Sequence, residues 1–226
     1  MVPHGELLVK LEKMGINMKI DRWIRNWLKG RLQRVLLKGE LSGWREVTSG
    51  VPQGSVMGPI LFNLFITDLG TKSGSVLIKS ADDTKLRGIA NSEKDRDIIQ
   101  EDLDDLVNWS NSNRIKFNSE KCKVMHLGIS NKNFSYKLGT HHLEVTEEKD
   151  LGILVDHRIT MSRQCDMVVK KLMWNASCED DKEVLVPLYK ALVRPHLEYC
   201  VPFWSPMFKK DAFKLEQVQR RATRMI

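Results

Sequence analysis

Two adjacent aspartates, Asp82 and Asp83, have the clearest potential for chemistry in this sequence. They lie between residues 75–80 and 85–89, two segments whose composition predicts β-strands. Neighbouring side chains on a regular strand point to opposite faces, so adjacent carboxylates serve one ligand only where the backbone turns. At a hairpin tip, a hard divalent cation such as Mg²⁺ would relieve the repulsion between the two charges. A solvated turn fits the same residues, because aspartate is common in turns.

A glycine- and proline-rich segment, residues 49–59 with the sequence SGVPQGSVMGP, is the second candidate. Its three glycines would let the backbone approach a ligand closely. The helix predicted to follow it would favour an anion at its N-terminus. Gln53 adds a neutral hydrogen-bond donor and acceptor suited to a nucleotide. An elaborate connection between a strand and a helix explains the segment equally well.

Aromatic and charged groups elsewhere have simpler interpretations. We expect three tryptophans on apolar helical stripes to pack in a core rather than to stack on bases: Trp23, Trp27 and Trp109. We expect one acidic helix face to be solvated rather than to bind a second metal: Glu101, Asp102, Asp104 and Asp105. One basic cluster fits either phosphate contacts or a solvated strand edge: Lys29, Arg31 and Arg34.

The composition is that of a globular chain with a basic surplus. The 226 residues include 36 Lys and Arg and 29 Asp and Glu, a net charge of +7, which favours a polyanionic partner. The four cysteines form no Cys-x-x-Cys pair, so we expect free thiols rather than a zinc ribbon or a disulfide-linked partner. The longest uncharged window, residues 47–67, contains glycines and prolines that would break a lipid-facing helix, so we expect no membrane partner.

Hydrophobic periodicity predicts the elements that must position these residues. Apolar residues recur every three or four positions in seven segments, which predicts helices within residues 7–14, 20–28, 59–65, 92–107, 165–172, 184–192 and 214–226. Short strands are predicted at residues 31–37 and 44–48, joined by a turn at 38–43, and at 75–80, 85–89, 114–117, 123–127, 136–138 and 151–155. The pattern predicts an α+β part that ends near residue 156 and a helical part after it.

Five blocks of the sequence resemble the reverse transcriptase domain of non-LTR, LINE-type (jockey-like) retrotransposons. In order, they are SGVPQGSVMGPILFNLFI, SADDTKL, NSEKCKVMHLG, EKDLGILV and LYKALVRPHLEYCVPFWSP, and together they extend over essentially the whole chain. The resemblance implies a polymerase right hand: a palm with an antiparallel sheet and helices, and a helical thumb. It places partial fingers and palm in residues 1–155 and a helical thumb-like region in residues 156–226.

The resemblance also implies an activity. The family consists of RNA-directed DNA polymerases, which are nucleotidyltransferases that use two Mg²⁺ ions, an RNA template, a DNA primer and dNTPs. The family acts inside the cell, in the nucleus, the cytoplasm or both. Asp82 matches the first aspartate of the family's Ala-Asp-Asp hairpin and would bind catalytic Mg²⁺, while Asp83 would assist or hold the turn. Three residues match the segment that shapes the pocket for the incoming nucleotide and the template: Pro52, Gln53 and Gly54.

Further site residues follow from the same resemblance. Asn118 and Lys121 match a later palm motif, whose lysine would protonate the leaving pyrophosphate. One turn matches the primer grip: Asp150, Leu151 and Gly152. One basic side of the last helix would face nucleic acid: Arg220, Arg221 and Arg224.

The sequence departs from the family at three places. The family draws another metal-binding aspartate from a strand before a Phe-Asp-x-Val-Pro-His segment, whereas this chain begins Met1-Val-Pro-His. Both ends look cut, so we expect an N-terminally truncated domain that lacks the first catalytic strand and does not extend a primer alone. Ser80 replaces a bulky aromatic residue, and residues 174–183 form a shorter, more acidic connection. Two alternatives stay open: a non-catalytic nucleic-acid-binding remnant and an unstable product of a decayed copy.

Overall fold

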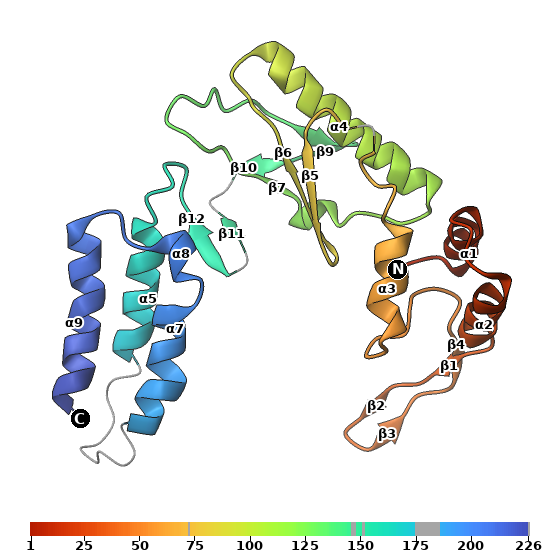
Figure 1. The fold of residues 1–226 in the computed structure, drawn as a ribbon, viewed down its shortest axis with the longest axis horizontal. Helices are drawn as coiled ribbons and strands as arrows, with labels where there is room; N and C mark the ends of the chain where they lie inside the picture. Colours follow the sequence, from red (N-terminus) through yellow and green to blue (C-terminus); the bar gives the residue numbers. More distant parts are fainter. Residues whose placement is uncertain (72, 146–147, 151, 175–185, 226) are drawn as a thin grey trace. The chain divides into compact units, whose positions relative to one another are not determined.

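The chain forms two compact units (Figure 1). The computed structural model describes residues 1–71, 73–145, 148–150, 152–174 and 186–225. Unit 1 comprises Met1–Cys122 and Phe134–Leu143, and unit 2 comprises Lys123–Asn133 and Glu144–Ile226. Within the described residues, helices combine with six two-stranded sheets, five antiparallel and one parallel, which confirms the predicted mixture of helices and small sheets. The boundary near residue 156 refers to polymerase subdomains and stays a prediction.

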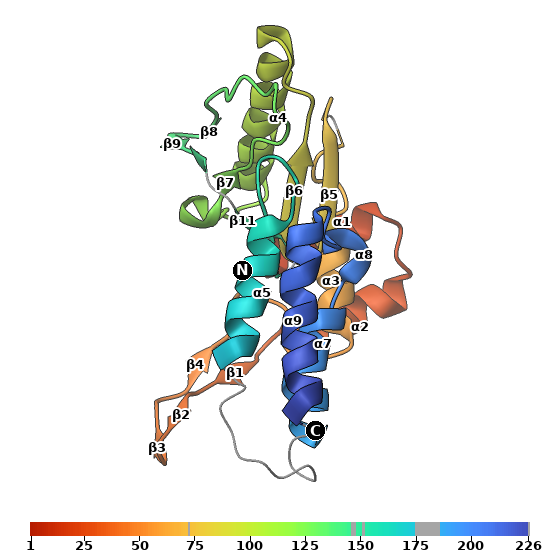
Figure 2. The same cartoon turned by 90° about the vertical axis from the view of Figure 1, so that its left-hand side faces the viewer.

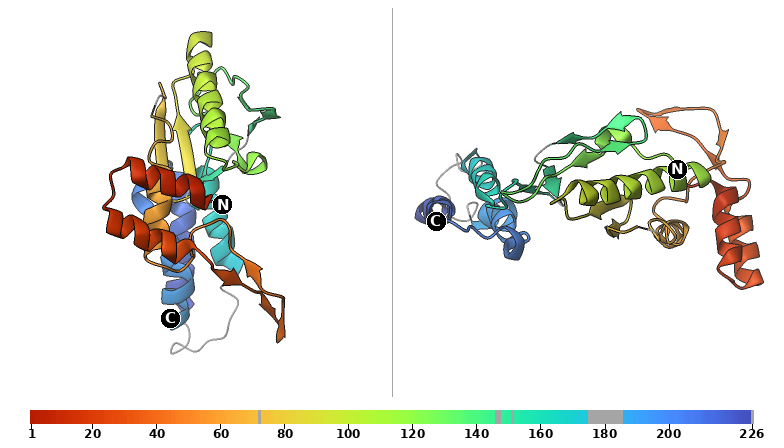
Figure 3. Two further views of the ribbon diagram at one scale, coloured as in Figure 1. Left: turned by 90° about the vertical axis from the view of Figure 1, so that its right-hand side faces the viewer. Right: turned by 90° about the horizontal axis from the view of Figure 1, so that it is seen from above.

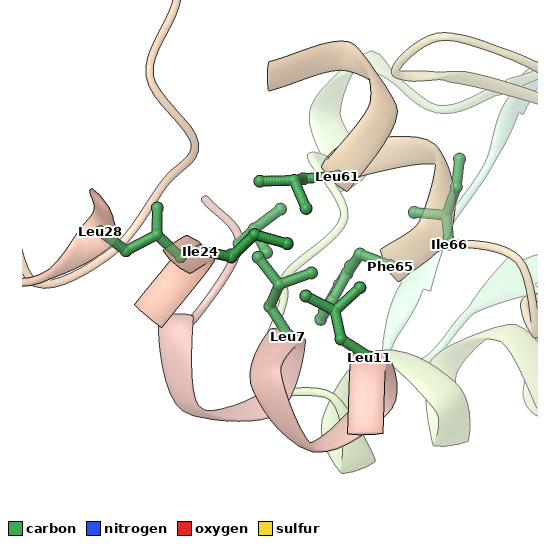
Figure 4. Packing of buried hydrophobic residues seen from close by; sticks show 8 residues of the cluster. Leu7, Leu11, Ile24, Leu28, Leu61, Phe65 and Ile66 are labelled. Atoms are coloured by element: carbon green, nitrogen blue, oxygen red, sulfur yellow. The ribbon is translucent and has the colours of Figure 1, made fainter. Parts of the chain in front are cut away.

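Three helices build the core of unit 1: α1 (His4–Lys13), α2 (Met18–Leu28) and α3 (Met57–Phe65). The predicted apolar stripes are the faces that meet (Figure 4), with these side chains buried: Leu7, Leu11, Ile24, Leu28, Leu61 and Phe65. The Asn17 side chain caps α2 by accepting a hydrogen bond from Lys19 N at 2.9 Å. Pro59 lies in the first turn of α3, as predicted, where its missing N–H costs no helical hydrogen bond.

A two-stranded ribbon, residues 31–47, connects α2 to the glycine-rich segment. Strand β1 (Leu32–Gln33) pairs with β4 (Arg45–Glu46), and β2 (Leu36–Leu37) pairs with β3 (Glu40–Leu41). The predicted turn over residues 38–43 is wrong, because the chain already reverses at Lys38 and Gly39, whose φ angles of 50° and 90° suit a two-residue hairpin. All eight strand residues are exposed, and the ribbon extends beyond the end of α2 (Figure 1).

A second hairpin and a long helix form the rest of unit 1. Strand β5 (Val76–Ser80) pairs with β6 (Asp83–Arg87), and α4 (Glu93–Ser112) lies alongside them (Figure 3). A capping box between Ser92 and Asp95 begins α4. The short strands β8 (Lys137–Leu138) and β9 (His141–His142) also pack against α4. The strand predicted at residues 114–117 is wrong, because this segment is irregular up to the 3₁₀ turn η1 (Ser119–Lys121).

Unit 2 combines short strands with a helical layer. Strand β7 (Lys123–Val124) pairs in parallel with β10 (Glu144–Val145), and β11 (Glu148–Asp150) forms a hairpin with β12 (Ile153–Val155). Its helical elements are α5 (Ser162–Trp174), the π-helical η2 (Tyr189–Val193), α7 (Arg194–Glu198), α8 (Val201–Trp204) and α9 (Lys209–Met225). Figure 2 shows α5 and α9 side by side. The predicted all-helical pattern after residue 162 is confirmed for the described residues.

Polar contacts join α5 to α9 in unit 2. The fully buried Asp211 accepts a hydrogen bond from the Ser162 hydroxyl at 2.6 Å, and Lys214 forms an ion pair with Asp166. Burial, followed by the nearby carboxylates, raises the pKa of the Cys165 thiol to about 11. Cys165 is therefore a packing residue, and it is a free thiol like Cys122 and Cys200. Among the helices described, none has the length and hydropathy to cross a lipid bilayer.

Candidate active site

The two aspartates lie at the tip of the β5–β6 hairpin. Ser80 pairs with Asp83, which leaves Ala81 and Asp82 as a two-residue turn and confirms the predicted hairpin. Ala81 adopts a φ of 53°, a left-handed conformation that costs a non-glycine residue roughly 1–2 kcal/mol. Both carboxylates are exposed, and within the described residues neither forms a hydrogen bond or an ion pair. The tip therefore presents two free oxygen ligands at the end of a paired ladder.

Lys79 fixes the tip end of this hairpin. Its ammonium group donates to three backbone carbonyls directly after α3, those of Ile66, Thr67 and Leu69, at 3.0, 3.1 and 3.0 Å. These three bonds use all the donors that a lysine has. The tip is thereby tied to the C-terminal end of α3, the helix that follows the glycine-rich segment.

Asp102 of α4 fixes the other end of the hairpin. Its carboxylate accepts hydrogen bonds from the backbone N–H groups of Gly74 and Ser75, both at 2.8 Å, directly before β5 begins. Asp102 is only 5% exposed, so the prediction of a solvated acidic face is wrong for this residue. Burial raises the pKa of the Asp102 carboxyl, but the hydrogen bonds from Ser75 and Gly74 outweigh burial and leave the pKa below its ordinary value.

Unit 1 is expected to lose stability in acid through Asp102. Because the folded pKa lies below the unfolded value of about 3.9, the stabilisation by Asp102 is complete above that pH and disappears as the pH falls through the folded pKa. Asp102→Ala should lower the free energy of unfolding at neutral pH by about 1–3 kcal/mol. The free energy of unfolding of this variant should also fall less steeply as the pH is lowered. Urea titrations between pH 2 and pH 7 measure both effects. Asp105→Ala, an exposed change on the same helix, should alter neither, and equal effects of the two variants would contradict this role.

The glycine-rich segment closes on itself before α3. The Ser55 hydroxyl donates to the Pro52 carbonyl at 2.7 Å and accepts from Gly58 N at 3.0 Å. A Cβ atom on Gly58 would lie 2.7 Å from the Pro52 oxygen, so this turn requires glycine. Gly54 has a φ of 77°, and both it and Gln53 are exposed. The loop thus holds Pro52, Gln53 and Gly54 in one hydrogen-bonded turn that presents Gln53 and Gly54 to solvent.

A lysine between two aromatic rings anchors the other end of α3. Lys10 donates to the Phe65 carbonyl at 2.8 Å and forms an ion pair with Asp68, and its ammonium lies 4.6 and 4.7 Å from the ring centres of Phe65 and Trp109. Trp109 Nε1 donates to Asp68 at 3.0 Å. Burial raises the pKa of Asp68, but the hydrogen bonds from Lys10 and Trp109 outweigh it, so the pKa is lowered. Asp68 therefore has a structural role and does not join the hairpin aspartates.

Asn118 and Lys121 lie together in the short η1 turn of unit 1. The backbone N–H of Lys121 donates to the Asn118 carbonyl at 3.0 Å, and the Cys122 thiol lies 3.3 Å from the same oxygen. Both side chains are exposed. The structure thus brings the residues of each predicted group together. No hydrogen bond or ion pair in the described part of unit 1 joins the hairpin tip, the glycine-rich turn and η1 to one another.

The remaining predicted residues belong to unit 2. Asp150 pairs with Ile153 in the β11–β12 hairpin, and Gly152 takes the left-handed φ of 87° that this turn requires. Leu151 lies outside the described residues, as does most of the predicted acidic connection at residues 174–183. The three predicted nucleic-acid-facing arginines are exposed residues of α9: Arg220, Arg221 and Arg224. Arg220 forms an ion pair with Glu216 at 2.8 Å.

The hairpin pair supplies only part of a two-cation site. Two-metal sites hold their ions about 3.5–4 Å apart between carboxylates of more than one element. Within the described residues, no third Asp, Glu, His or Cys joins Asp82 and Asp83 to form a metal-binding group. Two adjacent free carboxylates do fit Mg²⁺, which proteins often bind through one or two carboxylates together with water and substrate phosphates.

Sequence comparisons relate the chain to proteins of mobile elements. The family described as reverse transcriptase (RNA-dependent DNA polymerase) matches residues 1–166. The RNA-directed DNA polymerase from mobile element jockey of Drosophila melanogaster is 26% identical over 252 residues, and that of Drosophila funebris is 28% identical over 255 residues. Each match covers 99% of this chain and 26% of the relative. A probable RNA-directed DNA polymerase from the Drosophila melanogaster transposon X-element is 26% identical and covers 94% of this chain and 26% of that protein. The chain thus spans about a quarter of the length of these relatives.

Proposed function

This chain belongs to the reverse transcriptase (RNA-dependent DNA polymerase) family, and from that premise we propose that the β5–β6 hairpin carries the carboxylates of its nucleotidyl-transfer site. The chain is a reverse transcriptase domain of the kind found in non-LTR, jockey-like mobile elements. One observation supports the catalytic hairpin above all others. Among the described residues, nothing bonds to the exposed carboxylates of Asp82 and Asp83, which lie at the tip of a hairpin whose two ends are fixed by Lys79 and Asp102.

The proposed reaction joins a dNTP to a primer on an RNA template. The primer 3′-hydroxyl attacks the α-phosphate, and pyrophosphate leaves. Asp82 and Asp83 would hold Mg²⁺, which when bound neutralises charge on the attacking and leaving oxygens. Lys121 would give a proton to the leaving pyrophosphate, and Asn118 would contact the nucleotide or the template strand. The turn of Pro52, Gln53 and Gly54 would shape the pocket for the nucleotide and the template.

The finer architecture belongs to the same proposal. We assign residues 1–155 to partial fingers and palm and residues 156–226 to a thumb-like region. The turn at Asp150, Leu151 and Gly152 would grip the primer. Among the described residues, no carboxylate contacts Arg221 or Arg224, which supports a role in binding nucleic acid. The enzyme would act inside the cell, in the nucleus, the cytoplasm or both.

Catalysis requires a further carboxylate beside the hairpin, because the described residues supply a pair rather than a cluster. The 226-residue chain alone is therefore expected to incorporate no labelled dNTP on an RNA template with a DNA primer. An extended chain, with an added N-terminal strand that supplies a further aspartate, is expected to incorporate dNTP in the presence of Mg²⁺. Incorporation by the unextended chain that Asp82→Ala abolishes would contradict the incomplete site.

A protein that binds nucleic acid without catalysis is the second candidate, because the net charge of +7 favours a polyanionic partner. A folded but inactive extended chain would contradict the enzyme proposal. Binding of an RNA–DNA duplex by that chain, with an affinity that falls log-linearly with salt, would then support a protein that only binds nucleic acid. No binding of the duplex at low salt would contradict both candidates.

A further inference from the structure

Helix α2 presents a stacked pair of tryptophans at the surface of unit 1. The rings of Trp23 and Trp27 lie nearly parallel, 9° apart in orientation and 5.7 Å between centres. Trp27 packs against the core, as predicted from its apolar stripe. Trp23 is 52% exposed, so the prediction that it packs in the core is wrong. About half of the Trp23 surface is therefore accessible to a further aromatic group.

Two guanidinium groups continue this arrangement into the ribbon. Arg31 lies over the Trp27 ring, with Cζ 5.5 Å from the ring centre. Arg34 lies over Trp44 at 4.4 Å, and Trp44 is 60% exposed. Guanidinium groups held against indole rings gain cation–π attraction and keep their charge. The surface therefore alternates aromatic rings and positive charge, the two features that single-stranded nucleic acid requires.

The charge of this region is concentrated and largely unneutralised. Residues 18–47 contain eight Lys and Arg against three Asp and Glu, a net charge of +5 out of +7 for the whole chain. The structure describes every residue of this segment. Among the described residues, only Arg25 of the eight forms ion pairs with carboxylates, those of Asp21 on the same helix and of Glu12 on α1. A basic surface of this kind attracts a polyanion along its length.

We propose that this surface, the outer face of α2 together with the ribbon of residues 31–47, binds single-stranded nucleic acid. The bases stack on Trp23 and Trp44, and the phosphates lie along basic side chains such as Lys29 and Lys38. A duplex hides its base faces within its own stack, so it can use only the charges of this surface. An acidic protein segment would likewise leave the open ring face without an aromatic partner. This inference goes beyond the proposed function, because it assigns a strand-binding surface to α2 and the ribbon whose binding is measured without any synthesis.

The test measures fluorescence anisotropy of labelled single strands of about 12 nucleotides, a length within known site sizes. RNA and DNA strands form separate arms, and an RNA–DNA duplex of the same sequence is the third. Trp23→Ala in the 226-residue chain should weaken single-strand binding by about 5- to 100-fold, as the loss of one stacked base predicts. Its affinity for the duplex should stay within about twofold, since phosphate contacts carry duplex binding. Trp23→Phe, which keeps a ring, should restore most of the loss.

Phe203→Ala is the matched control, because Phe203 is 50% exposed in unit 2 and lies outside this surface. It should leave all three affinities unchanged, and circular dichroism should show that every variant keeps its fold. A Trp23-dependent preference for RNA or for DNA would support the proposal and identify the strand that is bound. Wild-type affinity of Trp23→Ala for single strands, equal losses for single strand and duplex, or no single-strand binding at low salt would each overturn it.

Discussion

Asp82→Ala is expected to lower nucleotide incorporation by the extended chain by about a thousandfold or more. The change removes one of the two carboxylates that the hairpin tip offers to a cation. A correctly held metal ion contributes several kcal/mol to the transition state, and every 1.36 kcal/mol corresponds to about a factor of ten in rate. Incorporation of labelled dNTP on an RNA template, measured in single turnover, tests this directly.

The hairpin geometry also predicts what Asp82→Ala leaves unchanged. The side chain is exposed and makes no hydrogen bond within the described residues, so the thermal midpoint without Mg²⁺ should not fall. Asp83→Ala is expected to cause a smaller loss of rate than Asp82→Ala. Asp83 begins the paired strand β6, and it would assist Asp82 in binding Mg²⁺. Asp105→Ala on α4 is the matched control and should keep full activity. Full activity of Asp82→Ala would contradict the catalytic hairpin.

Local patterns in the sequence predict the elements of unit 1 well. The helices α1, α2 and α3 follow from apolar residues three and four apart, and their buried core residues lie on the predicted stripes. Gly15 and Gly30 come two residues after the ends of α1 and α2, and their left-handed φ angles of 72° and 68° suit the ends of helices. The Ala-Asp-Asp turn follows from another local pattern, because two short apolar segments on either side of acidic residues indicate a hairpin.

Contacts between distant residues could not be predicted in this way. Lys10 reaches Asp68 across 58 residues, and Asp102 reaches Gly74 across 28. Such pairs depend on how helices pack, whereas periodicity reports only which face of one element is apolar. A signal was nevertheless present for Asp102, since it directly precedes Leu103 and belongs with Leu106 and Ser110 to the buried side of α4. Lys79, a lone charge in an apolar strand, was a similar signal.

The ribbon shows a different limit. The ribbon contains leucines and a tryptophan, which are typical of strands that pack against a core. Nevertheless, Leu36, Leu37 and Trp44 are all more than half exposed. A strand pair without a third strand or a helix on one face cannot bury its side chains. Composition therefore predicted the strands here but not their burial. Trp23 is exposed for a similar reason, because α2 packs against the core only with the side that carries Ile24 and Leu28.

Phe65→Ala is expected to lower the free energy of unfolding of unit 1 by about 3–5 kcal/mol, the usual loss for a large core aromatic side chain. Phe65 is fully buried, packs edge-on against Trp109 with ring centres 5.9 Å apart, and lies beneath the Lys10 ammonium. Its removal would leave a cavity and weaken the cation–π contact that helps to hold Lys10. Chemical denaturation with hydrogen exchange resolved by residue would measure the loss.

The location of Phe65 also determines where the loss should appear. It ends α3 directly before the carbonyls that Lys79 binds, so amides of α3 and of the β5–β6 hairpin should lose protection together. Phe213→Ala is the matched control, because that ring is 53% exposed on α9 and its loss should cost less than about 0.5 kcal/mol. Protection that falls in α3 but persists in the hairpin would show that Lys79 does not couple the two elements. Equal stability of both variants would contradict the packing described for this core.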